Sequence, residues 1–362
     1  MRILIINQGH TQNIGDVAIN EAIVSAISGS FDIQTRSVPF SIGPDTAEKS
    51  LICWALAKVS NHSSLIYEAL VSRAIKSVLD AEKCDAAIIG GGELLHGFHK
   101  PFASAFYLWT RELRRRGIPV CALGVSGDMP NSKWMKSRYK AALQRCSSVG
   151  VRDLQTLHYV KQEYGIESSY RAPDVVFSYG LSHELPERAR SASDTDSIIM
   201  FTPADLQKKY LQYLGIDTQE EYLSYLTEAL FQEVEARSAK KVLFASTDPS
   251  DYAIIDALFS RCSPRLEGLS VEAEVLPYGN LDTFLFELSN IDIVLSCRMH
   301  ACILGLVCGC KFTVIPFKEK LQVFAMEYSS IPSIEGVALD ARRSIVEAID
   351  ALRSAASKSN DE

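Results

Sequence analysis

Apolar stretches alternate with amphipathic ones along most of the chain, which indicates strands separated by helices. In the first half, short apolar runs predict buried strands at Arg2–Asn7, Ala86–Gly90, Pro119–Leu123 and Ser147–Val151. Helical periodicity lies between or after these runs, at 16–28, 102–116, 132–146 and 154–164. Strands that alternate with helices in this way form a parallel sheet that is covered on both faces.

The second half of the chain repeats this alternation. It predicts strands at Ser197–Phe201, Lys241–Ala245, Val271–Leu276, Asp292–Ser296 and Phe312–Ile315, with helices at 219–237, 251–260, 281–289 and 299–309. The polar, apolar-poor stretch before it is typical of a linker. The sequence therefore predicts an α/β protein with two Rossmann-like domains and an interdomain cleft.

The domain boundaries follow from the same pattern. We expect an N-terminal domain over 1–178, a linker over 179–196, a C-terminal domain over 197–338, a C-terminal amphipathic helix over 339–356 and a disordered polar tail over 357–362. The stretch 39–80 is less regular. Its helical periodicity at 51–59 and 64–79 predicts a flexible helical lobe over the cleft.

Composition and charge narrow the class of protein. Hydrophobic residues make up 47% of the 362 residues and charged residues 22%, and the net charge of -7 argues against a general nucleic-acid binder. The longest apolar run, Ala301–Cys310, is about half of the ~20 residues that span a bilayer. With no visible signal peptide, we expect a cytoplasmic protein. The nine cysteines lack metal-site spacing, and we interpret them as small buried apolar residues.

The candidate chemistry lies where predicted strands end, because open α/β sheets bind ligands at the carboxyl ends of their strands. Arg298 and His300 stand two residues apart where a buried strand passes into a buried helix. Burying a polar group there without a hydrogen-bonding partner would cost ~2–7 kcal/mol, and burying an unpaired charge would cost more. An anionic ligand is therefore expected, although buried protein partners are the alternative.

Two further polar segments follow strands of the first half. In the loop 8–16, Asn13 and Asp16 supply polar groups, and the alternative is an ordinary loop in which Asp16 caps a helix. After the next strand, Gly91 and Gly92 allow backbone N–H groups to face an anion, and Glu93 is a candidate base or hydrogen-bond acceptor. The glycines form neither a G-x-G-x-x-G nor a P-loop motif, so they specify no nucleotide.

Three more candidates follow later strands. Ser126 lies in the turn 124–127, and Arg152 leaves a strand end next to Asp153, for which a structural salt bridge with a helix cap is the alternative. Lys318 and Lys320 follow the last strand. Lysines at a helix start oppose the helix dipole, so these two are plausible anion contacts, with ordinary exposed lysines as the equal alternative.

Five stretches, in their order along the chain, resemble the polysaccharide pyruvyl transferase family. They are Asn13–Asp16, Ile88–Glu93, Val149–Asp153, Ala172–Asp174 and Ser296–His300. The resemblance spans roughly residues 1 to 330. It implies a GT-B-like fold and transfer of a pyruvyl group from phosphoenolpyruvate to two hydroxyls of a sugar, as a ketal, in the synthesis of exopolysaccharide or another cell-envelope glycan.

The resemblance also implies roles for the candidates. The C-terminal domain would hold the donor, with Arg298 and Lys318 on its phosphate and carboxylate, Arg152 of the N-terminal domain would be a further cation for them, and His300 would move protons. Asp16 or Glu93 would orient or deprotonate the acceptor on the N-terminal domain. Asn13, Gly91, Gly92 and Ser126 would complete the substrate contacts. Phosphoenolpyruvate is then a substrate, and no metal or other cofactor is called for.

The resemblance leaves the partners partly open. The acceptor is a sugar or glycan, lipid-linked or free, so peripheral contact with the inner face of a membrane is compatible with it, as is a homo-oligomer. The chain departs from the family at the turn Gly124–Asp128 and at Pro316–Lys318, which lacks a tyrosine often found there. Two alternatives therefore stay open: a GT-B glycosyltransferase that uses a nucleotide sugar, and a non-catalytic binding protein of the same fold.

Overall fold

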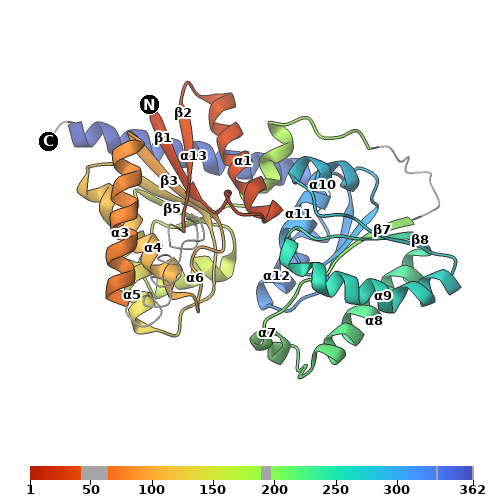
Figure 1. Cartoon of the computed structure of the whole chain (residues 1–362). Coiled ribbons are helices and arrows are strands. Elements are labelled where there is room, and N and C mark those ends of the chain that lie inside the picture. The colour runs from red at the N-terminus through yellow and green to blue at the C-terminus, as the bar shows by residue number, and fades with distance from the viewer. Residues whose placement is uncertain (42–63, 189–196, 332, 361–362) are drawn as a thin grey trace. The chain divides into compact units, whose positions relative to one another are not determined.

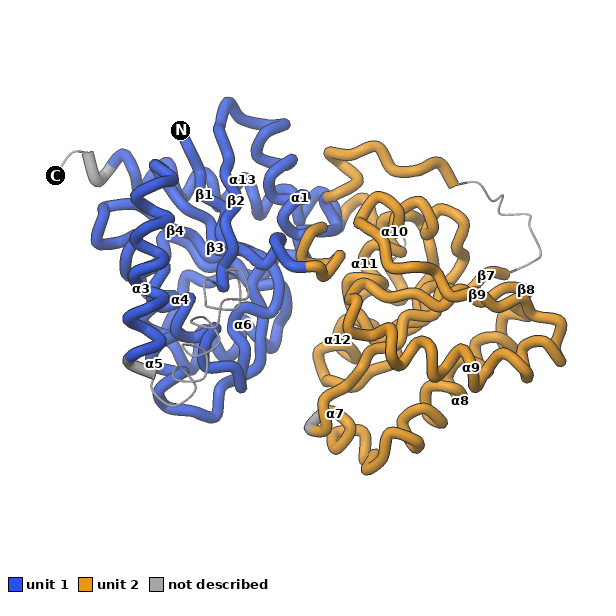
Figure 2. Tube along the Cα trace, in the orientation of Figure 1, with its two compact units in different colours: residues 1–11, 19–178, 337–362 blue, residues 12–18, 179–336 orange. Residues whose placement is uncertain are grey.

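The computed structural model describes residues 1–41, 64–188, 197–331 and 333–360 (Figure 1). The chain divides into two compact units, which Figure 2 shows in different colours. Unit 1 contains residues 1–11, 19–178 and 337–362, and unit 2 contains residues 12–18 and 179–336. Each unit is built around one parallel sheet.

Six parallel strands form the sheet of unit 1. In their spatial order they are β2 (Gln34–Pro39), β1 (Arg2–Asn7), β3 (Ala86–Gly92), β4 (Val120–Val125), β5 (Ser148–Val151) and β6 (Tyr170–Arg171). The central strands are buried along almost their whole length, because helices cover both faces of the sheet. Because all six strands are parallel, their carboxyl ends meet at one edge of the sheet.

Alternate side chains of these strands serve opposite faces. On one face, Leu4 and Ile6 join a large apolar core with α3 (Ser64–Ala81), α4 (Lys100–Arg115), α5 (Lys133–Leu143) and α6 (Leu154–Gln162). Helices α1 (Ile14–Ser30) and α13 (Ile334–Asn360) also belong to the layers of this unit, since Arg342 of α13 donates a hydrogen bond to Ser30 at the end of α1. Ala348 of α13 lies against Cys121 of β4.

Unit 2 has a five-stranded parallel sheet. The order is β11 (Lys311–Val314), β10 (Ile293–Ser296), β7 (Ser197–Thr202), β8 (Ala239–Phe244) and β9 (Glu272–Val275). Its helices are α7 (Lys208–Tyr213), α8 (Gln219–Arg237), α9 (Tyr252–Gly268), α10 (Leu281–Leu288), α11 (Met299–Val307) and α12 (Glu319–Tyr328), with 3-10 turns η1 (Val175–Leu181), which begins in unit 1, and η2 (Pro249–Asp251). Phe201 and Phe244 pack in the core that the sheet shares with α8 and α9.

The prediction of an α/β protein with two Rossmann-like domains is confirmed, while several element bounds differ. The last helix extends beyond the predicted 339–356 at both ends and continues through residues 357–360, which we expected in a tail. Helix α1 begins at Ile14 and not at Asp16. The short strands β2 and β6 were not predicted. The predicted helix at 51–59 and residues 189–196 of the expected linker lie outside the described residues.

No helix among the described residues combines the length and the apolar character that a membrane span needs.

Candidate active site

Arg298 lies at the end of β10, immediately before α11, with a bend that Ser296 stabilises. The Ser296 hydroxyl accepts a hydrogen bond from the Arg298 N–H at 2.7 Å and donates one to the Arg298 carbonyl at 2.9 Å. Thr202 at the end of the neighbouring strand β7 is hydrogen-bonded to the same hydroxyl. The backbone of Arg298 is therefore fixed by two adjacent strand ends.

The guanidinium of Arg298 is held by a carboxylate that the sequence did not single out. Arg298 Nε donates to Asp251 Oδ2 at 2.9 Å and Nη2 donates to Oδ1 at 2.5 Å. Asp251 is completely buried, whereas 26% of the Arg298 side chain is exposed. Burial opposes the charge of Arg298, but the hydrogen bonds and charge of Asp251 outweigh it, so the pKa of Arg298 is raised. The arginine therefore stays protonated.

Residues 12–18 bring the first polar motif to the same strand edge of unit 2. Asn13 caps α1, because its Oδ1 accepts hydrogen bonds from the N–H groups of Gly15 at 2.9 Å and Asp16 at 3.3 Å. The Ile14 N–H donates to the carbonyl of Thr247, in the loop after β8, at 2.8 Å. The cap that the sequence placed on Asp16 is thus made by Asn13, and the half-buried Asp16 lies in the first turn of the helix.

His300 packs against the backbone of this segment. A Cβ atom built on Gly15 would lie 2.3 Å from His300 Nδ1 and 2.5 Å from Cγ, distances that real side chains essentially never show. Only glycine therefore permits the imidazole to occupy this place. The Asn13 and Ser296 motifs, which lie far apart in the sequence, meet here within unit 2.

Asp248 is a second carboxylate of this region. Its Oδ2 accepts a hydrogen bond from Asn13 Nδ2 at 3.0 Å, and its Oδ1 accepts from the N–H and hydroxyl of Ser250. Burial raises the pKa of Asp248, but the hydrogen bonds from Ser250 and Asn13, together with the charge of Arg298, lower it by more. Asp248 is therefore ionised at neutral pH and anchors the Asn13 side chain.

Lys318 lies after the last strand of unit 2, at the residue that precedes α12. Its Nζ stands 4.5 Å from the ring centroid of Tyr210 and 5.8 Å from that of Phe317. A cation over an aromatic face is stabilised by about 0.5–2 kcal/mol. The two rings thus hold the ammonium group in place. Lys320 is in the first turn of the following helix.

Arg152 occupies the corresponding strand end in unit 1, just after β5. Its Nη1 donates to Asp174 Oδ2 at 2.6 Å and its Nε donates to the Ser126 hydroxyl at 2.8 Å. Only 6% of the Arg152 side chain and 5% of the Asp174 side chain are exposed. Asp153 caps α6 through the Thr156 N–H. The structure thus contains the salt bridge and helix cap that the sequence left as an alternative.

The glycines of the second motif are the last residues of β3, not a loop after it. Gly91 and Gly92 are buried and have φ angles of 79° and 80°, which favour glycine. A Cβ atom on Gly91 would lie 1.9 Å from Ile19 Cγ2 of α1. Close helix packing therefore accounts for Gly91. Glu93 follows at the strand end, half-buried, and its charge contributes to the raised pKa of Tyr139, which is mainly due to burial.

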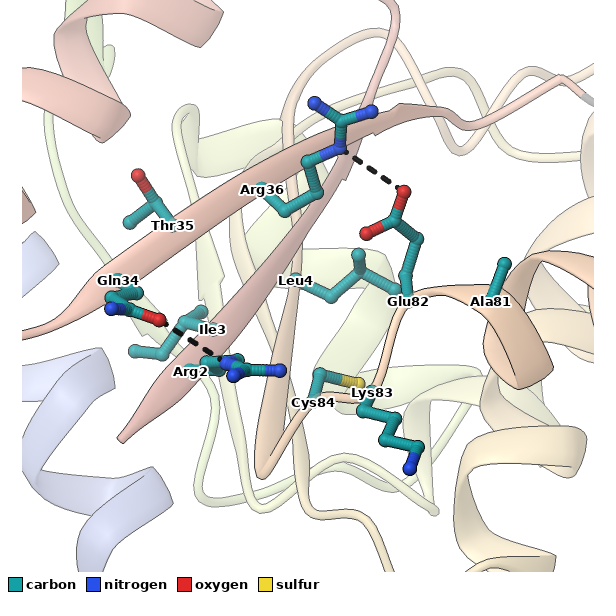
Figure 3. A pocket seen from close by; sticks show the side chains of 10 residues that line it. All are labelled: Arg2, Ile3, Leu4, Gln34, Thr35, Arg36, Ala81, Glu82, Lys83 and Cys84. Atoms are coloured by element: carbon teal, nitrogen blue, oxygen red, sulfur yellow. Dashed lines mark hydrogen bonds and ion pairs between the residues drawn. The ribbon is translucent and has the colours of Figure 1, made fainter.

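A pocket of about 310 Å³ lies at the opposite edge of the unit 1 sheet (Figure 3). It is bounded by the amino ends of β1 and β2 and the loop before β3, where an Arg36–Glu82 ion pair and an Arg2–Gln34 hydrogen bond cross its rim. None of the candidate residues lines it. Ligands of open α/β sheets bind at the carboxyl edge, so this pocket does not compete with the site above.

The candidates thus form two groups. Asn13, Asp16, Arg298, His300 and Lys318 belong to unit 2, and Gly91, Gly92, Glu93, Ser126 and Arg152 belong to unit 1. The sequence analysis missed Asp248 and Asp251. Both follow the predicted strand Lys241–Ala245, so the strand-end rule points to this loop, but it does not distinguish these two acids from their neighbours.

Solved structures with the same architecture define the class of fold. UDP-GlcNAc 2-epimerase from Neisseria meningitidis superposes with a TM-score of 0.57 at 11% identity, covering 96% of this chain and 99% of the epimerase. The enzyme of the same name from Methanocaldococcus jannaschii gives 0.56 at 12%, covering 97% and 99%, and S. aureus MnaA gives 0.55 at 9%, covering 97% and 87%. At such identities the similarity shows the fold alone, which is the expected GT-B-like fold with two Rossmann-like domains.

The sequence identifies the family within this class. The model of the polysaccharide pyruvyl transferase family matches residues 13–318, from the cap of α1 to the lysine before α12. The chain therefore belongs to the polysaccharide pyruvyl transferase family, as the resemblance of its motifs indicated. No sequence match to a curated protein was found.

Proposed function

We propose that this protein transfers a pyruvyl group from phosphoenolpyruvate to two hydroxyls of a sugar in a polysaccharide or cell-envelope glycan precursor. The observation that carries the proposal is the pairing, at one strand end of unit 2, of a fixed guanidinium with an imidazole two residues away. Arg298 suits an oxyanion of the donor, because guanidinium N–H groups match carboxylate and phosphate geometry. Lys318 supplies a further cation from the same unit.

The proposed reaction exchanges the phosphate of the donor for two oxygens of the acceptor. C3 of phosphoenolpyruvate takes a proton and becomes a methyl group, while one sugar hydroxyl forms a bond to C2 and loses its proton. The second hydroxyl then bonds to C2 and loses its proton, and phosphate departs with the electrons of its C2–O bond. The products are a pyruvate ketal and inorganic phosphate.

His300 is the proposed proton donor to C3, because an imidazole exchanges protons readily near neutral pH. Gly15 allows the ring to sit against the start of α1, where Asp16 is nearby in sequence. Asp16 and Glu93 are proposed to orient or deprotonate the acceptor hydroxyls. Developing negative charge on the departing phosphate would be stabilised by Arg298 and Lys318.

Phosphate release provides the test. The protein is incubated with phosphoenolpyruvate and a panel of lipid-linked and nucleotide-linked sugars, and inorganic phosphate and the acceptor mass are measured. We expect release with at least one acceptor and a mass gain equal to one pyruvic acid minus one water. His300→Ala should lower the rate by about 10²-fold or more, the usual contribution of a general acid, and leave the fold intact.

Thermal stability separates the proposal from its main rival. A ligand that binds only the native state raises the melting temperature by mass action. We expect phosphoenolpyruvate to do so and UDP- and GDP-sugars to do so less. Stabilisation by a nucleotide sugar alone, together with no phosphate release from phosphoenolpyruvate, would favour a glycosyltransferase.

A further inference from the structure

The carboxylate of Asp251 is held by four donors from three different segments. Oδ1 accepts from Arg298 Nη2 and from the N–H of Asp205 at 2.8 Å. Oδ2 accepts from Arg298 Nε and from the Ser246 hydroxyl at 2.5 Å. Asp251 has no exposed surface, and each of its two carboxylate oxygens accepts two hydrogen bonds. The carboxylate therefore has one orientation available.

The consequence for Arg298 is geometric. A bidentate contact through Nε and Nη2 fixes the plane of the guanidinium and its rotation in that plane. Nη1 is the remaining nitrogen, and it donates no hydrogen bond to another of the described residues. Because the side chain is partly exposed, its open edge can present N–H groups to a ligand.

We propose that Asp251 is a positioning residue that aims the Arg298 Nη1 donors at an oxyanion of the donor substrate. This inference rests on the proposed function, since it assumes an anionic donor at Arg298. The buried carboxylate also offsets the positive charge of the guanidinium. Arg298 therefore contributes directed hydrogen bonds more than net charge, and the net positive charge for the donor comes from other groups such as Lys318.

A structural role for Asp251 would predict something different. Its bonds to Asp205 and Ser246 tie the loops after β7 and β8 together, so its loss would affect stability whether or not Arg298 is present. A positioning role requires Arg298. The two roles are therefore separated by a double-mutant cycle on ligand binding.

The experiment measures the Kd of phosphoenolpyruvate by calorimetry for the full-length wild type, Asp251→Asn, Arg298→Ala and the double variant. We expect each single variant to bind about 10- to 30-fold more weakly, the double variant to bind no more weakly than Arg298→Ala, and the pH profile of binding to stay unchanged. Asp256→Asn on the exposed side of α9 is the matched control and should bind like the wild type. Unchanged binding by Asp251→Asn, or multiplicative losses in the double variant, would overturn the proposal.

Two additions keep the outcome decisive. Ser246→Ala removes one donor that orients Asp251, and we expect a two- to threefold weaker Kd, so the idea is tested even if Asp251→Asn does not fold. Inorganic phosphate serves as a second probe. If the wild type binds phosphate but not phosphoenolpyruvate, the proposed function fails. The double-mutant cycle measured with phosphate then still tests the positioning role of Asp251. If the wild type binds neither anion, the positioning role fails as well.

Discussion

Each unit holds an arginine just past a strand end, and each arginine is bonded to a buried aspartate, but the two pairs differ in access. Arg152 is almost fully enclosed, with Asp174 on one nitrogen and Ser126 on another. Arg298 donates hydrogen bonds to Asp251 through two nitrogens, and about a quarter of the Arg298 side chain is exposed. The same chemical pair is therefore enclosed in unit 1 and leaves a donor edge exposed in unit 2.

The largest expected effect tests the enclosed pair. Arg152→Ala removes the guanidinium that is paired with the buried Asp174, and breaking such a pair costs about 3–5 kcal/mol of unfolding free energy. Arg298→Ala should cost less, because water can reach the site of the lost side chain. Urea unfolding followed by tryptophan fluorescence reports the loss in unit 1, where Trp109 and Trp134 lie, and far-ultraviolet circular dichroism follows the helices of both units. Equal losses in the two variants would remove the distinction between the pairs.

The next largest expected effect is the loss of stability on replacing Gly91 in unit 1. Gly91→Ala places a methyl group 1.9 Å from Ile19 Cγ2 at a φ of 79°. The left-handed backbone and the overpacking together should cost about 2–4 kcal/mol, measured by the same urea titration. Activity per folded molecule should change little. A variant with full stability but no activity would instead favour the original expectation that Gly91 contacts the substrate.

Gly15 in unit 2 should show the opposite pattern. A methyl group there collides with the His300 ring and, at 2.7 Å, with His300 Cβ, so a small shift of the helix start is needed and the imidazole is displaced. We expect Gly15→Ala to lower the phosphate-release rate by about 10²-fold, the usual effect of a small misplacement of a catalytic group. Gly29→Ala on the same helix is the control, because its Cβ would meet only Arg342 at 3.7 Å. Similar rates in both variants would remove His300 from the mechanism.

The smallest effect concerns pH. Since the folded pKa of Asp248 is lowered, its contribution to stability is complete above the ordinary aspartate pKa of about 3.9 and is lost as the pH falls through the folded pKa. In Asp248→Asn, the unfolding free energy of unit 2 should therefore fall less as the pH is lowered than it does in the wild type. Urea midpoints at pH 5 and pH 3 measure it. If the variant loses as much stability between pH 5 and pH 3 as the wild type does, other carboxylates account for the acid sensitivity of unit 2.

The sequence predicted most of the strands because they depend on local patterns, and it placed the candidate residues where those strands end. Buried strands such as β1 and β10 are apolar along their length, and Arg298 and His300 follow one of them directly. Strand β2 escaped prediction because it is a mostly polar edge strand, with one buried residue in six, and such a pattern is typical of loops as well.

The partners of the site residues could not be predicted in the same way. The contact between Asn13 and Asp248 joins residues 235 positions apart, and the pair between Arg298 and Asp251 joins residues 47 positions apart. Nothing in the local pattern distinguishes Asp251 from the other acids of its loop. Its importance comes from burial and from the four donors around it, which only the folded unit reveals.

The assignment of residues 12–18 to unit 2 has a consequence for how the protein is made. These residues are synthesised before the rest of unit 2, yet their contacts with Thr247, Asp248 and His300 can form only after those later residues have left the ribosome. A separately expressed fragment that begins at Tyr179 would lack them. A short synthetic peptide that carries Asn13 and Gly15 is then the natural complement for restoring the surroundings of His300 in such a fragment.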